Sequence, residues 1–170
     1  SSTNLDNADV ISIAQEAGKS CVQVFFYRSK QNWGNQSYFP FHDKSHTAEE
    51  VLRSFIVKFY ENKNVPSEII LNKKIKDLNL IKLALEKKEK KLISIKVPSR
   101  SNALKLSRMA EKNAKETLTR KIFESETNNK LLNEVADKFK LDISPRLIEV
   151  YDNSHIQGSN SVGALITFGS

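Results

Sequence analysis

The sequence predicts an α/β protein built on one mixed sheet, with elements in the order β-β-β-α-β-α-β-α. Three strand-like segments joined by turns come first, which indicates an antiparallel meander. Helical and strand-like segments then alternate, a pattern typical of parallel crossover units. The chain is 39% hydrophobic with a mean hydropathy of −0.46, and no apolar run approaches the ~20 residues that span a bilayer. A globular protein without a membrane segment is therefore expected.

The meander is predicted from side-chain alternation and from strand-forming residue types. The expected strands are residues 9–15, 20–28 and about 36–41. The first alternates in polarity, and the second is rich in β-branched and aromatic residues. A short turn is expected at residues 16–19 and a longer one, containing Asn32 and Gly34, at residues 29–35.

The second half of the predicted domain alternates helices with strands. Thr47 and Glu50 have the spacing of a capping box, so a helix is expected to begin there. Its apolar face is expected to comprise Val51, Leu52, Phe55, Ile56 and Phe59. The later elements are a strand at 68–71, a basic helix at about 76–90, a strand at 92–97, a long helix at about 102–123 and a separate helix near 129–140.

This element order is that of the ribonuclease-H-like fold, a meander followed by right-handed crossover units. Residues 9–123 are expected to form one such domain, and residues 124–145 a connecting helix and linker. Residues 146–170 are expected to form the first hairpin of a second, truncated ribonuclease-H-like domain. A lone hairpin is only marginally stable, so the rest of that domain is expected to follow Ser170.

The hairpin places one carboxylate where a metal could bind. Strand alternation puts Ile148, Val150 and Asp152 on one face. A carboxylate that continues an apolar face is costly to bury without a partner, and a divalent cation is one such partner. Ser154 shares this face and could support the site from behind. His155 falls on the opposite face, where a structural or hydrogen-bonding role is expected.

Positive charge is concentrated in the middle of the chain, whose formal net charge is +7. Residues 73–121 hold sixteen Lys or Arg against five Asp or Glu, a surplus of eleven. Such a block is either a solvated helix face or a surface for a polyanion. The residues proposed to contact DNA are Arg100, followed by Lys105, Arg108, Lys112 and Lys115 at helical spacings. Leu104, Met109 and Leu118 are expected to supply apolar positions elsewhere around the same helix.

Cysteine and histidine give little sign of other chemistry. Cys21 is the single cysteine, which excludes an intrachain disulfide, and it is expected to be a small core or edge residue. No basic-then-apolar leader precedes it, so a reducing cytoplasm is the expected location. His42 and His46 flank Asp43 in a polar connector, which is expected to be solvated rather than to bind a metal.

Several segments of the chain, in order, carry a resemblance to a known family. They are DVIS at 9–12, SYFP at 37–40, EIIL at 68–71, PSR at 98–100, the pairs KL, MA and NA at 105–106, 109–110 and 113–114, and YDNSHIQG at 151–158. The last is the most specific. From Asp9 onward the chain resembles the UvrC family of the UvrABC excinuclease, the dual-incision nucleases of bacterial nucleotide excision repair.

The resemblance implies a metal-dependent DNA endonuclease as the full-length protein. Asp152 would be its first catalytic aspartate and a ligand of Mg²⁺ or Mn²⁺, in an enzyme that cuts the damaged strand on the 5′ side of the lesion. The remaining ligands would lie beyond Ser170, so this fragment is expected to be inactive and to bind no metal. The implied partners are damaged double-stranded DNA, UvrB through a segment before Ser1, and UvrA upstream in the pathway, with no membrane.

The first domain carries weaker signs of a nuclease site. Asp9 stands near the family's first-strand aspartate, Glu49 or Glu50 falls on the first helix, and Asn72 occupies a fourth-strand position that would ideally be acidic. Asparagine brings no charge to a cation site, so a degenerate, non-catalytic scaffold is expected. The alternative for the whole chain is a non-catalytic DNA- or protein-binding module with the same fold.

Overall fold

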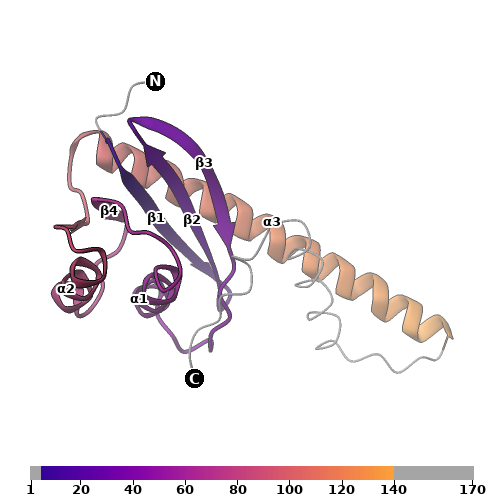
Figure 1. The fold of residues 1–170 in the computed structure, drawn as a ribbon. Coiled ribbons are helices and arrows are strands. Elements are labelled where there is room, and N and C mark those ends of the chain that lie inside the picture. The colour runs from indigo at the N-terminus through magenta and orange to yellow at the C-terminus, as the bar shows by residue number, and fades with distance from the viewer. Residues whose placement is uncertain (1–4, 140–170) are drawn as a thin grey trace.

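The computed structural model describes residues 5–139, which form a five-stranded sheet covered by helices on both faces (Figure 1). The strands are β1 (Ala8–Glu16), β2 (Lys19–Arg28), β3 (Gln31–Tyr38), β4 (Glu68–Leu71) and β5 (Ser94–Lys96). The helices are α1 (Ala48–Phe59), α2 (Leu78–Glu89) and α3 (Ser101–Phe139). This is the predicted element order, and the mixed α/β sheet is consistent with a ribonuclease-H-like domain.

The sheet has the strand order β3-β2-β1-β4-β5. β1, β2 and β3 pair antiparallel, whereas β4 pairs parallel with β1 and β5 parallel with β4. The helices that separate the last strands make the parallel return possible. The capping box of Thr47 and Glu50 is present at the start of α1, and β4 has the predicted bounds.

The third strand begins five residues earlier than predicted. Ser29 and Lys30 both have positive φ and form a two-residue turn, so β3 starts at Gln31. The register then shifts between Phe26 and Tyr27, which leaves Trp33 as an extra residue of β3. Asn32 and Gly34, predicted to be turn residues, instead flank this bulge. Bulges and turns favour the same residue types, which is why the pattern misled.

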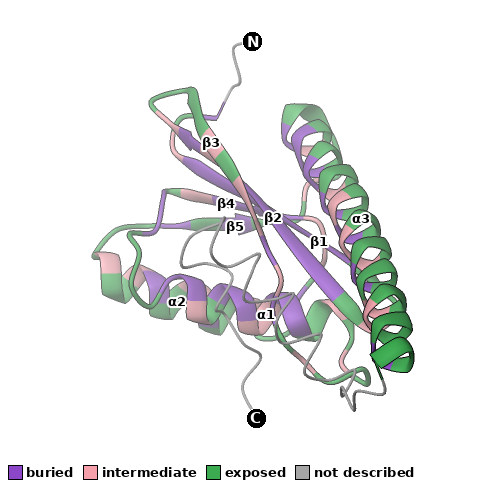
Figure 2. Cartoon of the chain, turned by 90° about the vertical axis from the view of Figure 1, so that its right-hand side faces the viewer, coloured by how far each residue is buried: buried purple, intermediate pink, exposed green. Residues whose placement is uncertain are grey.

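Two apolar layers hold the helices onto the sheet. On one face, Ile11, Ile13 and Val24 pack with Phe55 of α1 and Ile81 of α2. On the other, side chains of β1 and β2 pack against α3, and Figure 2 shows the buried side of α3 turned toward the sheet. Cys21 is buried in this second layer, where burial raises the pKa of its thiol to about 12. The expectation of a core position is confirmed.

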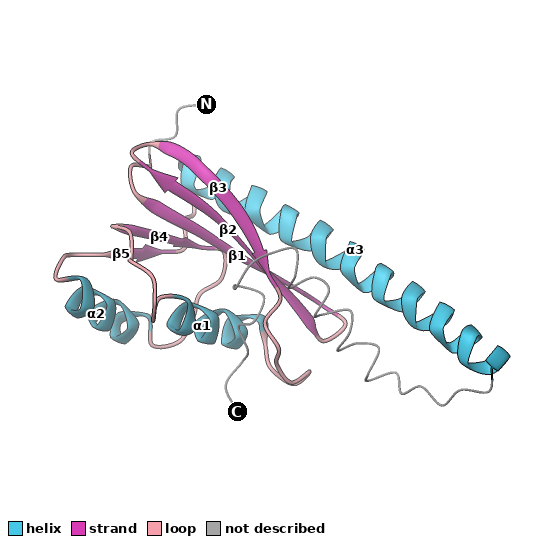
Figure 3. Cartoon of the chain, turned by 45° about the vertical axis from the view of Figure 1, so that its right-hand side comes forward, coloured by secondary structure: helices cyan, strands magenta, loops and turns pink. Residues whose placement is uncertain are grey.

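The prediction of two helices after residue 101 is wrong, because α3 continues unbroken to Phe139. Ser125, Thr127 and Asn128 resemble a helix boundary, but neither Gly nor Pro interrupts residues 101–139. Figure 3 shows the second half of α3 projecting past the ends of β1 and β2. Although α3 is long, no helix in residues 5–139 is both long and apolar enough to cross a membrane.

Candidate nucleic-acid interface

The proposed DNA-contacting residues lie on the side of α3 that faces away from the sheet. All four helical residues, Lys105, Arg108, Lys112 and Lys115, are exposed, and Arg100 is exposed just before the helix begins. Positions three and four apart share one side of a helix, so these cations form a single row, here called the basic stripe. Its exposed position is what contact with a phosphate backbone requires.

Among the described residues, the cations of the basic stripe are only weakly neutralised by nearby acidic side chains. Lys112 Nζ lies 4.0 Å from Glu116 Oε1, and both side chains are largely exposed. An exposed pair of this length contributes little to stability. Met109, which is 49% exposed, lies with Lys105, Arg108 and Lys112 around a shallow depression of about 450 Å³. The prediction that Met109 belongs to a packing face is wrong.

The rotation of α3 is fixed by small residues on its opposite side. Ala103, Ala110 and Ala114 are buried against the sheet, with Ala110 and Ala114 fully so. The Ser12 hydroxyl donates a 2.8 Å hydrogen bond to the backbone carbonyl of Ser107. Small side chains allow the helix backbone to approach the strands closely, and this contact turns the basic stripe outward. Leu118 is buried as predicted.

Asp9 is buried and fully engaged by neighbouring side chains. Its Oδ1 accepts from Arg28 Nη1 at 2.9 Å, and its Oδ2 accepts from the Tyr60 hydroxyl at 2.6 Å. Burial raises the pKa of the Asp9 carboxyl, although the hydrogen bond from Tyr60 and the charge of Arg28 pull it back down. Arg28 is a diagonal cross-strand neighbour of Asp9, so counting register from the first hairpin turn could have found it. Nothing in the sequence pointed to Tyr60.

The other positions considered for a nuclease site in this domain do not meet Asp9. Asn72 follows β4 and bonds to both backbone groups of Ile13 at 2.9 Å, at the far end of β1. Asp9 and Ile13 are four strand residues apart, about 13 Å. Asn72 therefore lies beside the backbone of Ile13 and not beside Asp9.

Asn72 also joins the sheet to α3. Its Nδ2 donates a 2.6 Å hydrogen bond to Glu111 Oε1, in addition to its bond to the carbonyl of Ile13. No local pattern in the sequence indicated this contact. Through these bonds Asn72 links the end of β4 to β1 and to α3, the helix that carries the basic stripe. The role of Asn72 is therefore structural.

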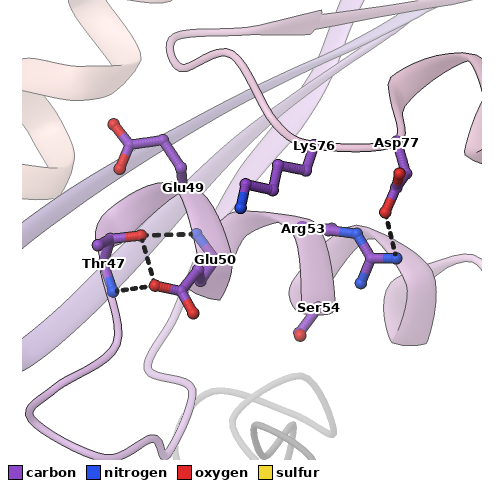
Figure 4. A pocket seen from close by; sticks show the side chains of 7 residues that line it. All are labelled: Thr47, Glu49, Glu50, Arg53, Ser54, Lys76 and Asp77. Carbon is purple, nitrogen blue, oxygen red and sulfur yellow. Dashed lines mark hydrogen bonds and ion pairs between the residues drawn. The ribbon is translucent and has the colours of Figure 1, made fainter.

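The acidic residues at the start of α1 do not join Asp9 either, because they are hydrogen-bonded elsewhere or lie too far away. Glu50 Oε1 accepts from the Thr47 backbone N–H at 3.2 Å and from its hydroxyl at 3.0 Å (Figure 4). Tyr60, which contacts Asp9, comes ten residues after Glu50, about 15 Å along the helix. Beside the capping box, Arg53 pairs with Asp77 at 3.2 Å. The pocket in Figure 4 thus contains a helix cap and a surface ion pair.

The histidine connector is held by hydrogen bonds to its own backbone and to Ser20. The Ser20 hydroxyl lies 2.8 Å from His42 Nε2, and Asp43 Oδ1 accepts from the backbone N–H of Ser45 at 2.9 Å. His46 Nδ1 accepts from the backbone N–H of Asp43 at 3.2 Å. Within residues 5–139, no group of three or more His, Cys, Asp or Glu could hold a metal ion. Asp152, Ser154 and His155 lie outside the described residues.

Comparison with known proteins identifies two family models along the chain. The model described as the UvrC ribonuclease H-like domain matches residues 7–121, and the model described as the UvrC RNase H endonuclease domain matches residues 136–170. Among similar curated proteins, UvrABC system protein C of Ruegeria sp. (strain TM1040) is 46% identical over 97% of this chain and 26% of its own length. The proteins of that name from Bradyrhizobium diazoefficiens (46%) and Rhodopseudomonas palustris strain HaA2 (47%) match over 97% of this chain and 24% of their own lengths. The chain thus spans about a quarter of these relatives.

Proposed function

The chain belongs to the UvrC family, and from that membership we propose that it is part of the nuclease of bacterial nucleotide excision repair. The names of its relatives refer to a UvrABC system, and the family model over residues 136–170 is that of an endonuclease domain. We place the whole protein in the cytoplasm, acting with UvrA and UvrB on damaged double-stranded DNA.

Within that nuclease, residues 7–121 serve as a DNA-facing scaffold rather than as a second active site. This assignment rests on a difference in charged groups between two sides of the domain. The cations of the basic stripe are exposed in one row, whereas the Asp9 carboxylate is buried and bonded to Arg28 and Tyr60. Binding phosphates needs exposed cations, and holding a catalytic metal needs clustered, available carboxylates.

Cleavage is assigned to the domain that contains Asp152. Asp152 is proposed as a metal ligand and catalytic residue, with Ser154 and His155 supporting it from outside the metal's coordination sphere. Bound Mg²⁺ or Mn²⁺ would activate the attacking water and stabilise charge on the phosphate. Asp152 would fix the position of the cation beside the scissile bond. The family match over residues 136–170 supports placing cleavage in this domain.

A cleavage assay on a chain extended beyond Ser170 tests this division of labour. Lesion-containing duplex is incubated with Mg²⁺ and wild-type, Asp152→Asn or Asp9→Ala protein, each checked for folding by circular dichroism. The 5′ incision is expected to be lost in Asp152→Asn and kept in Asp9→Ala. Equal cleavage by wild type and Asp152→Asn rejects the catalytic role of Asp152. Loss of incision in a folded Asp9→Ala protein rejects the scaffold role of the first domain.

A second candidate is a non-catalytic module that binds DNA or a protein. It is favoured by the engagement of Asp9, whose two carboxylate oxygens are both bonded to neighbouring side chains. The same assay separates the candidates, because a module of this kind would bind the duplex through the basic stripe and leave it uncut with either Mg²⁺ or Mn²⁺.

A further inference from the structure

A second basic pocket lies away from the basic stripe, where α3 passes the β1–β2 turn. It has a volume of about 320 Å³ and is lined by three different parts of the chain. Lys19 comes from the start of β2, Lys44 from the connector after β3, and Lys121 from α3. None of the described residues that line it is acidic. The exposed cations Lys19 and Lys44 in this lining favour an anionic ligand.

The position of Lys44 depends on the turn beneath it. Gly18 has a φ of +74°, and a Cβ at this position would lie 2.7 Å from Cγ of Lys44. The aliphatic stem of Lys44 therefore crosses the turn at a distance that only glycine permits without displacement. Lys44 and Lys19 both line the pocket beside this turn.

The pocket also has aromatic walls. Phe39 and Phe41 line it on either side of Pro40, and Phe41 remains 44% exposed. Lys121 Nζ lies 3.9 Å from the centroid of the Phe39 ring, a cation–π contact. Phe39 thus positions a cation, and Phe41 offers apolar ring surface to a ligand.

The histidine at the pocket wall is held in one orientation. His42 Nε2 lies 2.8 Å from the hydroxyl of the buried Ser20, and His42 Nδ1 lies 2.9 Å from the backbone carbonyl of Asp43. A carbonyl can only accept, so Nδ1 donates to Asp43, and Ser20 holds the other nitrogen of the ring. The ring therefore forms a fixed part of the pocket wall.

We infer that this pocket binds one nucleotide of single-stranded DNA, with its phosphate between Lys19 and Lys44 and its base against Phe41. The volume is at the lower end of the ~300–1,000 Å³ typical of small-ligand sites, so it suits one nucleotide and not a duplex. Cations combined with an exposed aromatic ring are the usual means of binding single strands. An acidic peptide would use the cations but not the ring. The inference rests on the proposed function only for the presence of DNA, since the basic stripe lies elsewhere on α3.

Fluorescence polarisation with a labelled thymidine dodecamer and with a blunt duplex of the same length tests the inference on the chain as it exists. Phe41→Ala is expected to weaken binding of the single strand about tenfold, because stacking of a base is lost. Lys19→Glu with Lys44→Glu is expected to weaken it at least as much. Lys87→Glu with Lys91→Glu, two exposed reversals on and just after α2, is the matched charge control and should leave single-strand binding unchanged.

The outcomes separate this pocket from the basic stripe. If Lys105→Glu with Lys112→Glu weakens duplex binding and spares the single strand, while Phe41→Ala weakens single-strand binding, both sites are supported. If that variant changes neither affinity while Phe41→Ala weakens single-strand binding, the basic stripe does not contact DNA and the pocket is still supported. The inference is overturned if folded Phe41→Ala binds the dodecamer like wild type. It is also overturned if the lysine reversals weaken binding of a labelled glutamate decamer and not of the dodecamer, since the ligand is then an acidic peptide.

Discussion

The Tyr60 hydroxyl donates a 2.6 Å hydrogen bond to Oδ2 of Asp9 and so joins the end of α1 to the first strand of the sheet. Both side chains are buried, and Asp9 Oδ1 also pairs with Arg28 Nη1 at 2.9 Å. A carboxylate held in this way fixes the seating of α1. Both of its oxygens are already bonded to neighbouring side chains.

Tyr60→Phe removes the hydroxyl and leaves one oxygen of Asp9 without its partner. A buried acceptor left unpaired costs about 1–3 kcal/mol, so the free energy of unfolding should fall by that amount. Urea unfolding followed by circular dichroism measures it. Tyr38→Phe is the matched control, because its hydroxyl makes a longer, 3.3 Å bond to Gln36. A loss as large for Tyr38→Phe as for Tyr60→Phe would contradict the assigned role of the Asp9 contact.

Asp9→Asn should remove a pH dependence of stability. Burial raises the pKa of Asp9 above its usual value of 3.8, so the folded protein binds this proton more tightly than the unfolded chain. The contribution of Asp9 is then most favourable below pH 3.8 and is lost as pH rises through the folded pKa. The stability of wild type minus that of Asp9→Asn should therefore decrease over this window. Urea unfolding from pH 3.5 to 7 measures the difference, and an increase with pH would show that Arg28 and Tyr60 outweigh burial.

Asn72→Ala should destabilise the junction of β4, β1 and α3. It deprives the N–H and carbonyl of Ile13 of their side-chain partners, so a loss of about 1–3 kcal/mol is expected in thermal or urea unfolding. Asn79→Ala, on the exposed side of α2, is the control and should change stability little.

Asn72→Asp sharpens this test because it keeps the acceptor and loses the donor. Its carboxylate would face Glu111, which now accepts from Asn72 at 2.6 Å. Asn72→Asp should therefore be less stable than wild type at neutral pH and should recover in part as acid protonates the carboxylates. A variant that is equally destabilised at pH 4 and pH 7 would argue against repulsion from Glu111.

Charge reversal at Lys105, Arg108 and Lys112 should weaken duplex binding and flatten its dependence on salt. Each phosphate that the protein no longer neutralises makes the negative slope of log K against log salt shallower by about 0.9. Binding isotherms at several NaCl concentrations measure the slope. The control reverses three exposed lysines on the other side of the sheet, Lys74, Lys87 and Lys91. Equal slopes for the two triple variants would show that the basic stripe is an ordinary solvated helix face and not a DNA contact.

The fold could be predicted where local chemistry and tertiary context agree. The capping box at Thr47 and the EIIL strand at 68–71 are specified by short-range signals, and the structure places them as expected. The start of β3 was missed because Ser29 and Lys30 form a tight turn without a typical turn sequence, while Asn32 and Gly34 serve a bulge. The end of α3 was missed because polar residues near Ser125 imitate a helix boundary in a segment that lacks Gly and Pro.

The candidate site was predictable to the extent that it depends on helical spacing. Lys105, Arg108 and Lys112 follow from periodicity alone, and all three are exposed. Periodicity assigned the wrong side to Met109, because the sheet-facing side of α3 is made of Ala110 and Ala114 together with Leu106 and Leu118. The basic pocket at Lys19, Lys44 and Lys121 joins three segments distant in sequence, and no local pattern could have shown it.

α3 is one unbroken helix, so a change in its length changes the rotation of its far end as well as the distance to it. Its 39 residues span about 58 Å, and residues 136–139 of the endonuclease match are its last turn. Inserting one residue after Arg120 would turn those last residues by about 100° and advance them by about 1.5 Å. A loop would absorb such a change, but a helix transmits it. Within α3, the count of residues therefore sets an angle as well as a distance.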